Sequence, residues 1–298
     1  MSLNTLDLQA LAATARTAAT TLRQNRPASL TAAAAVGAAV AIPLLWRLVA
    51  DYRAWYALGP NGLSSNPGGY LFQVLLTPLA RADTCVPAPY DPVALARSPP
   101  YGPLSRRSFF AAGAVPPRAR ARPDIPRFVA PHRQTSQRGS AATRARQNDF
   151  LRALAAANPA LLCVRPSRLE GPLFDALWVT TTPTPATEEG EGKGGEGPPQ
   201  HRAELRRLSG EFAHVHGEGS THLVLSPADA AAAIAAGWGE RHPMSGVSIR
   251  RGRSMLPWGY IMIYAPREGD DDEMRIWREF VVASARYIFA GEQEIVIP

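Results

Sequence analysis

The feature that most constrains the fold is a pair of alternating stretches joined by a tight turn. EFAHVH at residues 211–216 and STHLVLS at residues 220–226 each read as a strand, and the Gly-Glu-Gly between them is a turn signal. The two stretches therefore predict a β-hairpin. Two more apolar runs, LFDALWVTTT at 173–182 and WGYIMIYAP at 258–266, predict further strands.

Three helices are expected around these strands, and each has a recognisable start. One begins at Ser140 and stops before Asn158-Pro159, and a second begins at Ser226-Pro227, where serine is a preferred N-cap. A third begins in the acidic run from Asp270, whose charges suit a helix N-terminus. Its apolar face contains Met274, Trp277, Val281, Ala285 and Ile288. Together these elements predict an α+β fold, a mainly antiparallel sheet covered by helices.

An apolar run from Pro27 to Trp46 predicts a membrane anchor. Its length suits a span of about 20 residues, and arginines and aromatic residues flank it. A secretory signal peptide is the rival interpretation, but the polar segment 1–26 is long for its n-region. We therefore expect a transmembrane helix at 27–50 of a single-pass endomembrane protein. Its catalytic domain is expected in the cytosol, where phenolic substrates are usually handled.

The chain's net charge of +7 comes mostly from one Pro/Arg-rich segment, residues 51–139. These arginines do not form a helical stripe with interleaved aromatic residues, so nucleic acid is not an expected partner. The segment is expected to wrap or tether the domain at 140–298, or to contact anionic lipid. A low-complexity insertion at 183–200 interrupts that domain. Cys85 and Cys163 lack the spacing of a redox or metal motif.

Three of the chain's six histidines lie within thirteen residues, at His214, His216 and His222. The first two share a strand face, and the third lies across the hairpin from them. Three interpretations remain open: a metal site with Glu218 or Glu240, a proton-transfer site, or histidines held by ordinary hydrogen bonds. A carboxylate only two residues after His216 is not the usual ligand spacing, so we expect proton transfer and no tightly bound metal.

Two later motifs supply candidate substrate-binding residues. GWGERHP at 237–243 either caps a helix with its tryptophan in the core or presents ionisable groups to a pocket, and YAPR at 264–267 ends a strand. The predicted substrate-binding residues are Trp238, Glu240, Arg241, His242, Tyr264 and Arg267.

Taken together, these motifs resemble the fungal luciferase family. The resemblance is carried by EFAHVHGEGSTHL, GWGERHP and IYAPR before the acidic helix start, and by DYRAWYALGP and GGY nearer the N-terminus. It covers nearly all of the chain beyond residue 40. The turn after His216 is shorter than in luminous members and lacks a histidine that they carry. The insertion at 183–200 and the loop SGVSIRRGRSMLP also differ, so the chain resembles a non-luminous homologue.

The resemblance implies a membrane-anchored oxygenase of an enolic hydroxy-pyrone such as 3-hydroxyhispidin. The deprotonated pyrone is electron-rich enough to react with O2 without a cofactor. The protein then supplies a base, a cation such as Arg241 or Arg267, and a dry aromatic pocket. We expect His216, beside the turn, to be the base and His214 to orient it.

The expected partners are the pyrone or related aromatic enol, O2 and a lipid membrane. Two alternatives come from other classes. One is a non-catalytic membrane-associated protein that binds an aromatic metabolite or anionic lipid. The other is a metal-dependent enzyme that uses the three clustered histidines.

Overall fold

The chain divides into two units in the computed structural model, Met1–Ala54 and Trp55–Pro298. The structure describes residues 26–87, 90–97, 101–180, 208–250 and 253–298. The insertion expected at 183–200 lies outside the described residues.

Helix α2, Arg26–Tyr56, contains the predicted membrane anchor. The prediction of a single-pass membrane protein is wrong, because no helix among the described residues is long and apolar enough to cross a bilayer. Charged side chains interrupt the second half of α2 at Arg47, Asp51 and Arg53. In addition, Pro43 lies inside the helix.

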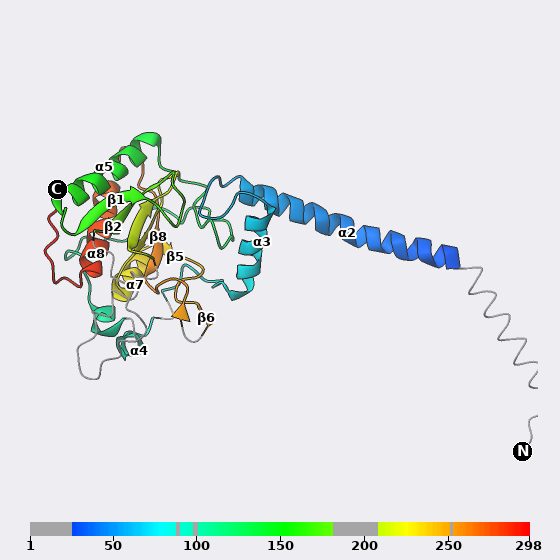
Figure 1. Cartoon of the computed structure of the whole chain (residues 1–298), viewed down its shortest axis with the longest axis horizontal. Helices are drawn as coiled ribbons and strands as arrows, with labels where there is room; N and C mark the ends of the chain where they lie inside the picture. Colours follow the sequence, from blue (N-terminus) through cyan, green and yellow to red (C-terminus); the bar gives the residue numbers. More distant parts are fainter. Residues whose placement is uncertain (1–25, 88–89, 98–100, 181–207, 251–252) are drawn as a thin grey trace, which may run out of the picture. The chain divides into compact units, whose positions relative to one another are not determined.

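A six-stranded antiparallel sheet forms the centre of the second unit (Figure 1). Its strands, in spatial order, are β1 (Leu162–Pro166), β2 (Asp175–Val179), β3 (Glu211–Val215), β4 (Thr221–Val224), β8 (Tyr260–Ile263) and β5 (Gly239–Arg241). Every neighbouring pair is antiparallel, and β3 and β4 form the predicted hairpin. The α+β prediction with a mainly antiparallel sheet is therefore confirmed. Strands β1 and β5 were not expected.

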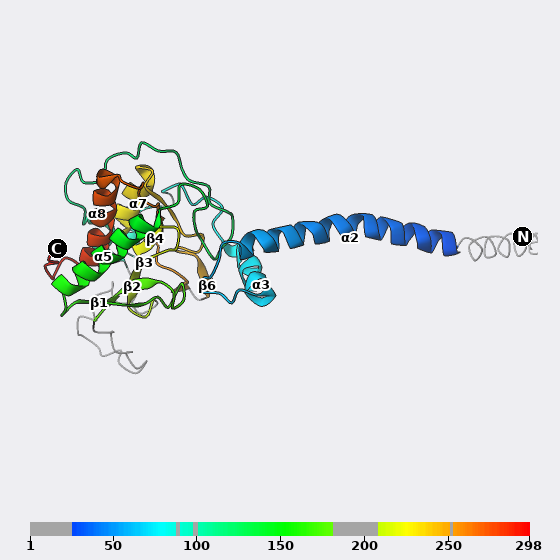
Figure 2. The ribbon, with the colours of Figure 1, turned by 90° about the horizontal axis from the view of Figure 1, so that it is seen from above.

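The three main helices begin where the sequence predicted. They are α5 (Ala141–Ala157), α7 (Pro227–Ala235) and α8 (Asp271–Ile288). The side chains of Ser140, Ser226 and Asp270 each accept a hydrogen bond from a backbone N–H in the first turn, as N-cap residues do. Helices α5 and α8 lie side by side in both views (Figures 1 and 2), and the rings of Phe150 and Trp277 meet between them.

Helix α8 packs on one face of the hairpin strands. Trp277, which is 1% exposed, donates its ring N–H to the hydroxyl of Thr221 at 2.8 Å. Ser284 donates to the carbonyl of Val224 at 2.7 Å. Because successive strand residues point to opposite faces, His222 beside Thr221 points away from α8. The helix-covered face holds the apolar core, and the opposite face is left for polar side chains.

Shorter elements complete the second unit. They are α3 (Pro67–Leu76), the 3-10 turns at Thr77–Leu79 and Gly102–Arg106, α4 (Pro92–Arg97), and the strand pair β6 (Ser248–Arg250) and β7 (Arg253–Ser254).

The Pro/Arg-rich stretch between Arg107 and Gly139 contains no helix or strand, yet long-range hydrogen bonds hold it in place. The ring N–H of Trp55 donates to the Ala130 carbonyl at 2.8 Å, and the Gly139 amide donates to the Glu218 carbonyl at 2.7 Å. These contacts fix a segment with little apolar surface of its own against the sheet domain.

Candidate functional site

Three predicted site residues lie in one row across the sheet. The strand register pairs His214 with His222, His222 with Met262, and Met262 with Glu240. Directly opposite residues of antiparallel strands point to the same face. The row therefore lies on the face opposite α8.

The other two clustered histidines of this region come from strand ends. His216 follows β3, and His242 follows β5. The ring centroid of His222 lies 4.6 Å from that of His216, 5.3 Å from that of His214 and 5.3 Å from that of His242. All four side chains are buried. The structure thus brings together the three histidines predicted as catalytic, with His242 beside them.

A fifth histidine, His132, joins the cluster from the Pro/Arg-rich segment. Its Nδ1 lies 3.2 Å from Nε2 of His222, and its Nε2 lies 3.0 Å from Oε1 of Glu240. The sequence interpretation missed His132 because it stands alone in an aperiodic stretch. The scarcity of histidine was the available signal, since the chain has only six.

Hydrogen bonds to neighbouring side chains orient the imidazoles of His214 and His216. His214 Nδ1 lies 2.7 Å from Oε1 of Glu211, and His216 Nδ1 lies 2.8 Å from Oγ of Ser220. Ser220 in turn donates its hydroxyl hydrogen bond to Glu218. Burial alone would raise the pKa of Glu211 and of Glu218, but charge interactions and hydrogen bonds, mainly with His214 and His216, outweigh burial and lower both pKa values. Both carboxyl groups are therefore ionised near neutral pH.

Burial holds three members of the cluster in the neutral form. It lowers the pKa of His216, against the raising effect of the nearby carboxylates of Glu218 and Glu170. It lowers the pKa of His222 and of His242 further, and the neighbouring histidines add to the effect. His216, His222 and His242 are therefore neutral imidazoles near neutral pH, with carboxylates around them.

The carboxylate of Glu240 is the hub of a second hydrogen-bond network. It accepts from Thr84 at 3.0 Å, from Arg122 at 2.7 Å and from the phenol of Tyr264 at 3.0 Å, in addition to His132. Burial would raise the pKa of Glu240, but the hydrogen bonds and charges of His132 and Arg122 outweigh it and lower the pKa to about 2. Glu240 is therefore a permanent anion next to the histidines.

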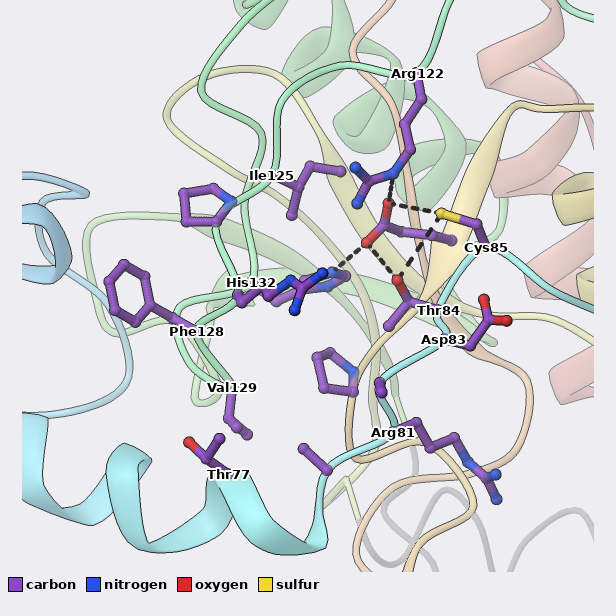
Figure 3. A pocket seen from close by; sticks show the side chains of 16 residues that line it. Thr77, Arg81, Asp83, Thr84, Cys85, Arg122, Ile125, Phe128, Val129 and His132 are labelled. Carbon is purple, nitrogen blue, oxygen red and sulfur yellow. Dashed lines mark hydrogen bonds and ion pairs between the residues drawn. The ribbon is translucent and has the colours of Figure 1, made fainter. Parts of the chain in front are cut away.

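A cavity of about 390 Å³ opens beside this network, a volume suited to a small ligand (Figure 3). His132, Glu240 and Arg122 form its polar wall, and Ile125 and Phe128 are among its apolar residues. Figure 3 shows Thr84 and Cys85 on the polar side of the cavity. Of the five clustered histidines, His132 is the one on the cavity wall.

The other predicted substrate-binding residues lie in different surroundings. Trp238 belongs to the core, where its ring N–H donates to the Pro116 carbonyl at 2.6 Å. Arg241 is fully buried over the ring of Trp258 rather than at the cavity. Arg267 is exposed past the end of β8. Tyr264 reaches the site through its hydrogen bond to Glu240.

Two groups of described side chains bring potential metal ligand atoms within 4.8 Å of one another. They are Glu170, His214, His216 and His222, and His132, His222 and His242. The first group includes Glu170, which the sequence interpretation did not select. Arg133 holds Glu170 in place by an ion pair.

Comparison with known proteins finds luciferases, both over the hairpin region and over most of the chain. The family model described as Luciferase domain matches residues 209–284. The chain is 27% identical to the luciferase of Armillaria ostoyae over 274 residues, which cover 90% of each chain. It is 26% identical to the luciferase of Neonothopanus nambi over 267 residues, which cover 89% of this chain and 88% of that one. The chain is similar to fungal luciferases over most of its length. No solved structure matches it.

The family model and the full-length matches cover different parts of the site. Residues 209–284, which match the Luciferase domain model, contain His214, His216, His222 and Glu240. They leave out His132 and Glu170. The site in this chain therefore extends beyond the segment that the Luciferase domain model matches.

The charge of Glu240 predicts a pH-dependent difference between the parent and Glu240→Gln. Since its pKa is lowered from 4.5 to about 2, ionised Glu240 stabilises the fold above pH 4.5, and this contribution falls away as the pH drops towards 2. The parent should be the more stable protein at pH 7, and the difference should shrink by about 2 kcal/mol by pH 3.

Denaturant unfolding at a series of pH values measures this difference. Exposed Glu268→Gln is the control and should run parallel to the parent. Parallel curves for Glu240→Gln as well would show that the carboxylate is not held as an anion.

Proposed function

We propose that this protein is an oxygenase that adds O2 to a small enolic hydroxy-pyrone of the 3-hydroxyhispidin type, with the histidine cluster taking up the enol proton. The observation that carries the proposal is the position of His132, between the cavity and the other histidines. Similarity to fungal luciferases over most of the chain supports an O2-dependent reaction on a small molecule.

The chemistry begins with loss of the enol proton. The resulting enolate is electron-rich and can pass an electron to O2, so the reaction needs no flavin. Combination at carbon gives a peroxide, which closes on the lactone carbonyl and then loses carbon dioxide. The protein's part is to accept the proton, hold the anion and exclude water.

His132 is the proposed first proton acceptor, in place of His216. His216 is buried behind the cavity wall and faces Glu170, with Nε2 3.8 Å from Oε1. His132 lies on the wall, and ionised Glu240 accepts a hydrogen bond from its Nε2. The enol proton would go to Nδ1 of His132, which would exchange its hydrogen bond with Nε2 of His222 for one with the substrate. The imidazolium so formed would be stabilised by the Glu240 carboxylate, in the way a carboxylate supports a catalytic histidine elsewhere.

The cavity also offers complementary groups for the rest of the substrate. Arg122 brings its guanidinium group, and with it positive charge, to the polar wall, which favours a bound enolate. Phe128, Ile125 and Val129 offer apolar surface for the substrate rings. We infer that the aryl group rests on these residues while the enol faces His132.

Oxygen uptake by the purified full chain tests the proposal. With 3-hydroxyhispidin, uptake should match the substrate consumed and carbon dioxide should be released. The pyrone 3,4-di-O-methyl ether is the control, because both enol hydroxyls are blocked and no enol proton remains, and it should support no uptake. Binding of 3-hydroxyhispidin without uptake would favour the non-catalytic alternative. Absence of binding would exclude this substrate class.

A further inference from the structure

We propose that Glu170, His214, His216 and His222 form a binding site for one divalent first-row transition-metal ion. The proposal rests on side-chain geometry alone and is independent of the proposed function. The sequence favoured a histidine cluster without metal and left a metal site open as an alternative. The proposal takes the metal site.

Each of the three histidines has one ring nitrogen in a hydrogen bond and the other without a hydrogen-bond partner. The unpartnered atoms are Nε2 of His214, Nε2 of His216 and Nδ1 of His222, all fully buried. Together with an oxygen of Glu170, one ligand atom from each residue lies within 4.8 Å of all the others. Buried polar atoms are normally hydrogen-bonded, so three such nitrogens at one point require an explanation.

The outer partners fix the protons of the two β3-side imidazoles. Ionised Glu211 can only accept, so the Nδ1–H of His214 donates to it. Ser220 gives its hydroxyl proton to Glu218, so its oxygen accepts from the Nδ1–H of His216. In the neutral rings, both Nε2 atoms then carry lone pairs rather than hydrogens.

The same reasoning reaches His222 through His132. Ionised Glu240 accepts from the Nε2–H of His132, so Nδ1 of His132 is an acceptor. His222 must therefore donate its Nε2–H to His132, which leaves Nδ1 of His222 as a lone pair. Three lone pairs and a carboxylate oxygen thus face one another, and a cation is the partner that satisfies all four.

This arrangement is costly without a cation. Each unsatisfied buried acceptor costs about 1–3 kcal/mol. A histidine whose second nitrogen is hydrogen-bonded to a carboxylate or another fixed acceptor is the usual form of a metal ligand, because the outer bond sets its tautomer and raises its basicity. Glu211, Ser220 with Glu218, and His132 have this role for the three rings.

The buried charges also favour a divalent ion. Among the described residues, Arg133 pairs with Glu170 and Arg122 pairs with Glu240. Glu211 and Glu218 form ion pairs with histidines only, within the part of the chain that the structure describes. With neutral histidines, these two buried carboxylates leave a charge that one divalent cation balances.

Protonation of two histidines is the competing way to balance this charge. It would place N–H groups where the lone pairs now meet, so the new donors would face one another. The metal is therefore the better counter-charge.

The second group of ligand atoms is a weaker site. Its members His132 and His222 are hydrogen-bonded to each other, and Nδ1 of His242 accepts from the Met244 amide at 3.1 Å. Three imidazoles and one carboxylate suit zinc, iron, copper or nickel rather than magnesium or calcium. The sequence interpretation placed the fourth ligand at Glu218 or Glu240, whereas the structure uses both as outer partners and offers Glu170 instead.

Metal binding by the full chain, without substrate, tests the site. Elemental analysis of purified protein should find close to one equivalent of a first-row metal. After chelation and dialysis, Co²⁺ should restore one equivalent with visible d–d absorption, and Zn²⁺ should raise the thermal midpoint. His216→Ala should lose the absorption and the thermal shift, and Glu211→Gln should bind about 10–100-fold more weakly.

His242→Ala is the matched control, because it removes a buried histidine of the same cluster outside the four ligands. It should keep one equivalent and the cobalt spectrum. Two results would overturn the proposal: a parent protein that binds neither Co²⁺ nor Zn²⁺, or a His216→Ala variant that binds them as the parent does. Near-ultraviolet circular dichroism of each variant shows whether it is folded, and if His216→Ala does not fold, Glu211→Gln decides. None of these measurements depends on catalytic turnover, so a failed oxygen-uptake assay does not affect them.

Discussion

His132→Gln should lower the rate of oxygen uptake by about 10²–10⁴-fold, the usual effect of removing a general base. Glutamine can still donate a hydrogen bond towards Glu240 from near the position of Nε2, so the carboxylate keeps a partner. It cannot accept a proton near neutral pH. The variant therefore separates proton transfer from the support that His132 gives to the cavity wall.

Two further measurements make this result specific. His132 lies outside the four proposed metal ligands but orients His222, so His132→Gln should bind Co²⁺ about 10–100-fold more weakly, and its uptake is compared with that of the parent at saturating metal. Exposed Arg138→Ala, in the same segment, should retain full uptake. Uptake by His132→Gln at nearly the parental rate would show that the enol proton leaves by another route.

Trp277→Ala should lower the free energy of unfolding by about 3–5 kcal/mol. Trp277 is among the largest fully buried side chains, and its removal leaves a cavity between α8, α5 and the sheet. It also leaves the Thr221 hydroxyl without its ring N–H donor. Because Thr221 precedes His222 on β4, the substitution loosens the strand that carries the centre of the histidine cluster.

Variants with smaller expected effects calibrate the Trp277 result in denaturant unfolding. Trp277→Phe keeps most of the ring volume but loses the hydrogen bond, so it should cost less than alanine. Arg275→Ala, on the exposed side of α8, removes only a surface ion pair with Asp272 and should change the free energy by less than about 1 kcal/mol. A Trp277→Ala loss no larger than that of Arg275→Ala would mean that α8 does not pack on β4 as described.

Local signals were sufficient to predict the helices and the hairpin. The side chains of Ser140, Ser226 and Asp270 make the hydrogen bonds that define an N-cap within their own first turns, so nothing distant is needed to recognise them. The alternation around His214 and His222 likewise depends only on the geometry of one hairpin.

The edge strands could not be predicted in this way. In β5, Gly239 follows Gly237-Trp238 and suggested a turn. In the structure, a Cβ at Gly239 would lie 2.4 Å from the Met262 carbonyl oxygen, so glycine permits close approach to β8. Strand β1 ends in Pro166, which a strand tolerates at an edge.

The missing site residues depend on contacts between distant parts of the chain. His132 and Arg122 lie in an aperiodic segment, and Glu170 lies in a loop between β1 and β2. No spacing rule connects His132 to Glu240, since 108 residues separate them. Only the folded sheet brings the proline-rich segment over the histidine row, so local pattern could supply three histidines but not the residues that surround them.

The separation of His132 from the hairpin has a consequence for recombining this protein with its relatives. A crossover placed between residue 133 and residue 211 would join an incoming hairpin to a resident proline-rich segment. The hybrid would then combine His132 and Arg122 from one parent with the histidine row and Glu240 from the other. Hybrids that inherit residues 122–133, 167–170 and 211–242 from a single parent should keep a matched site, and libraries of chimaeras should treat these three stretches as one block.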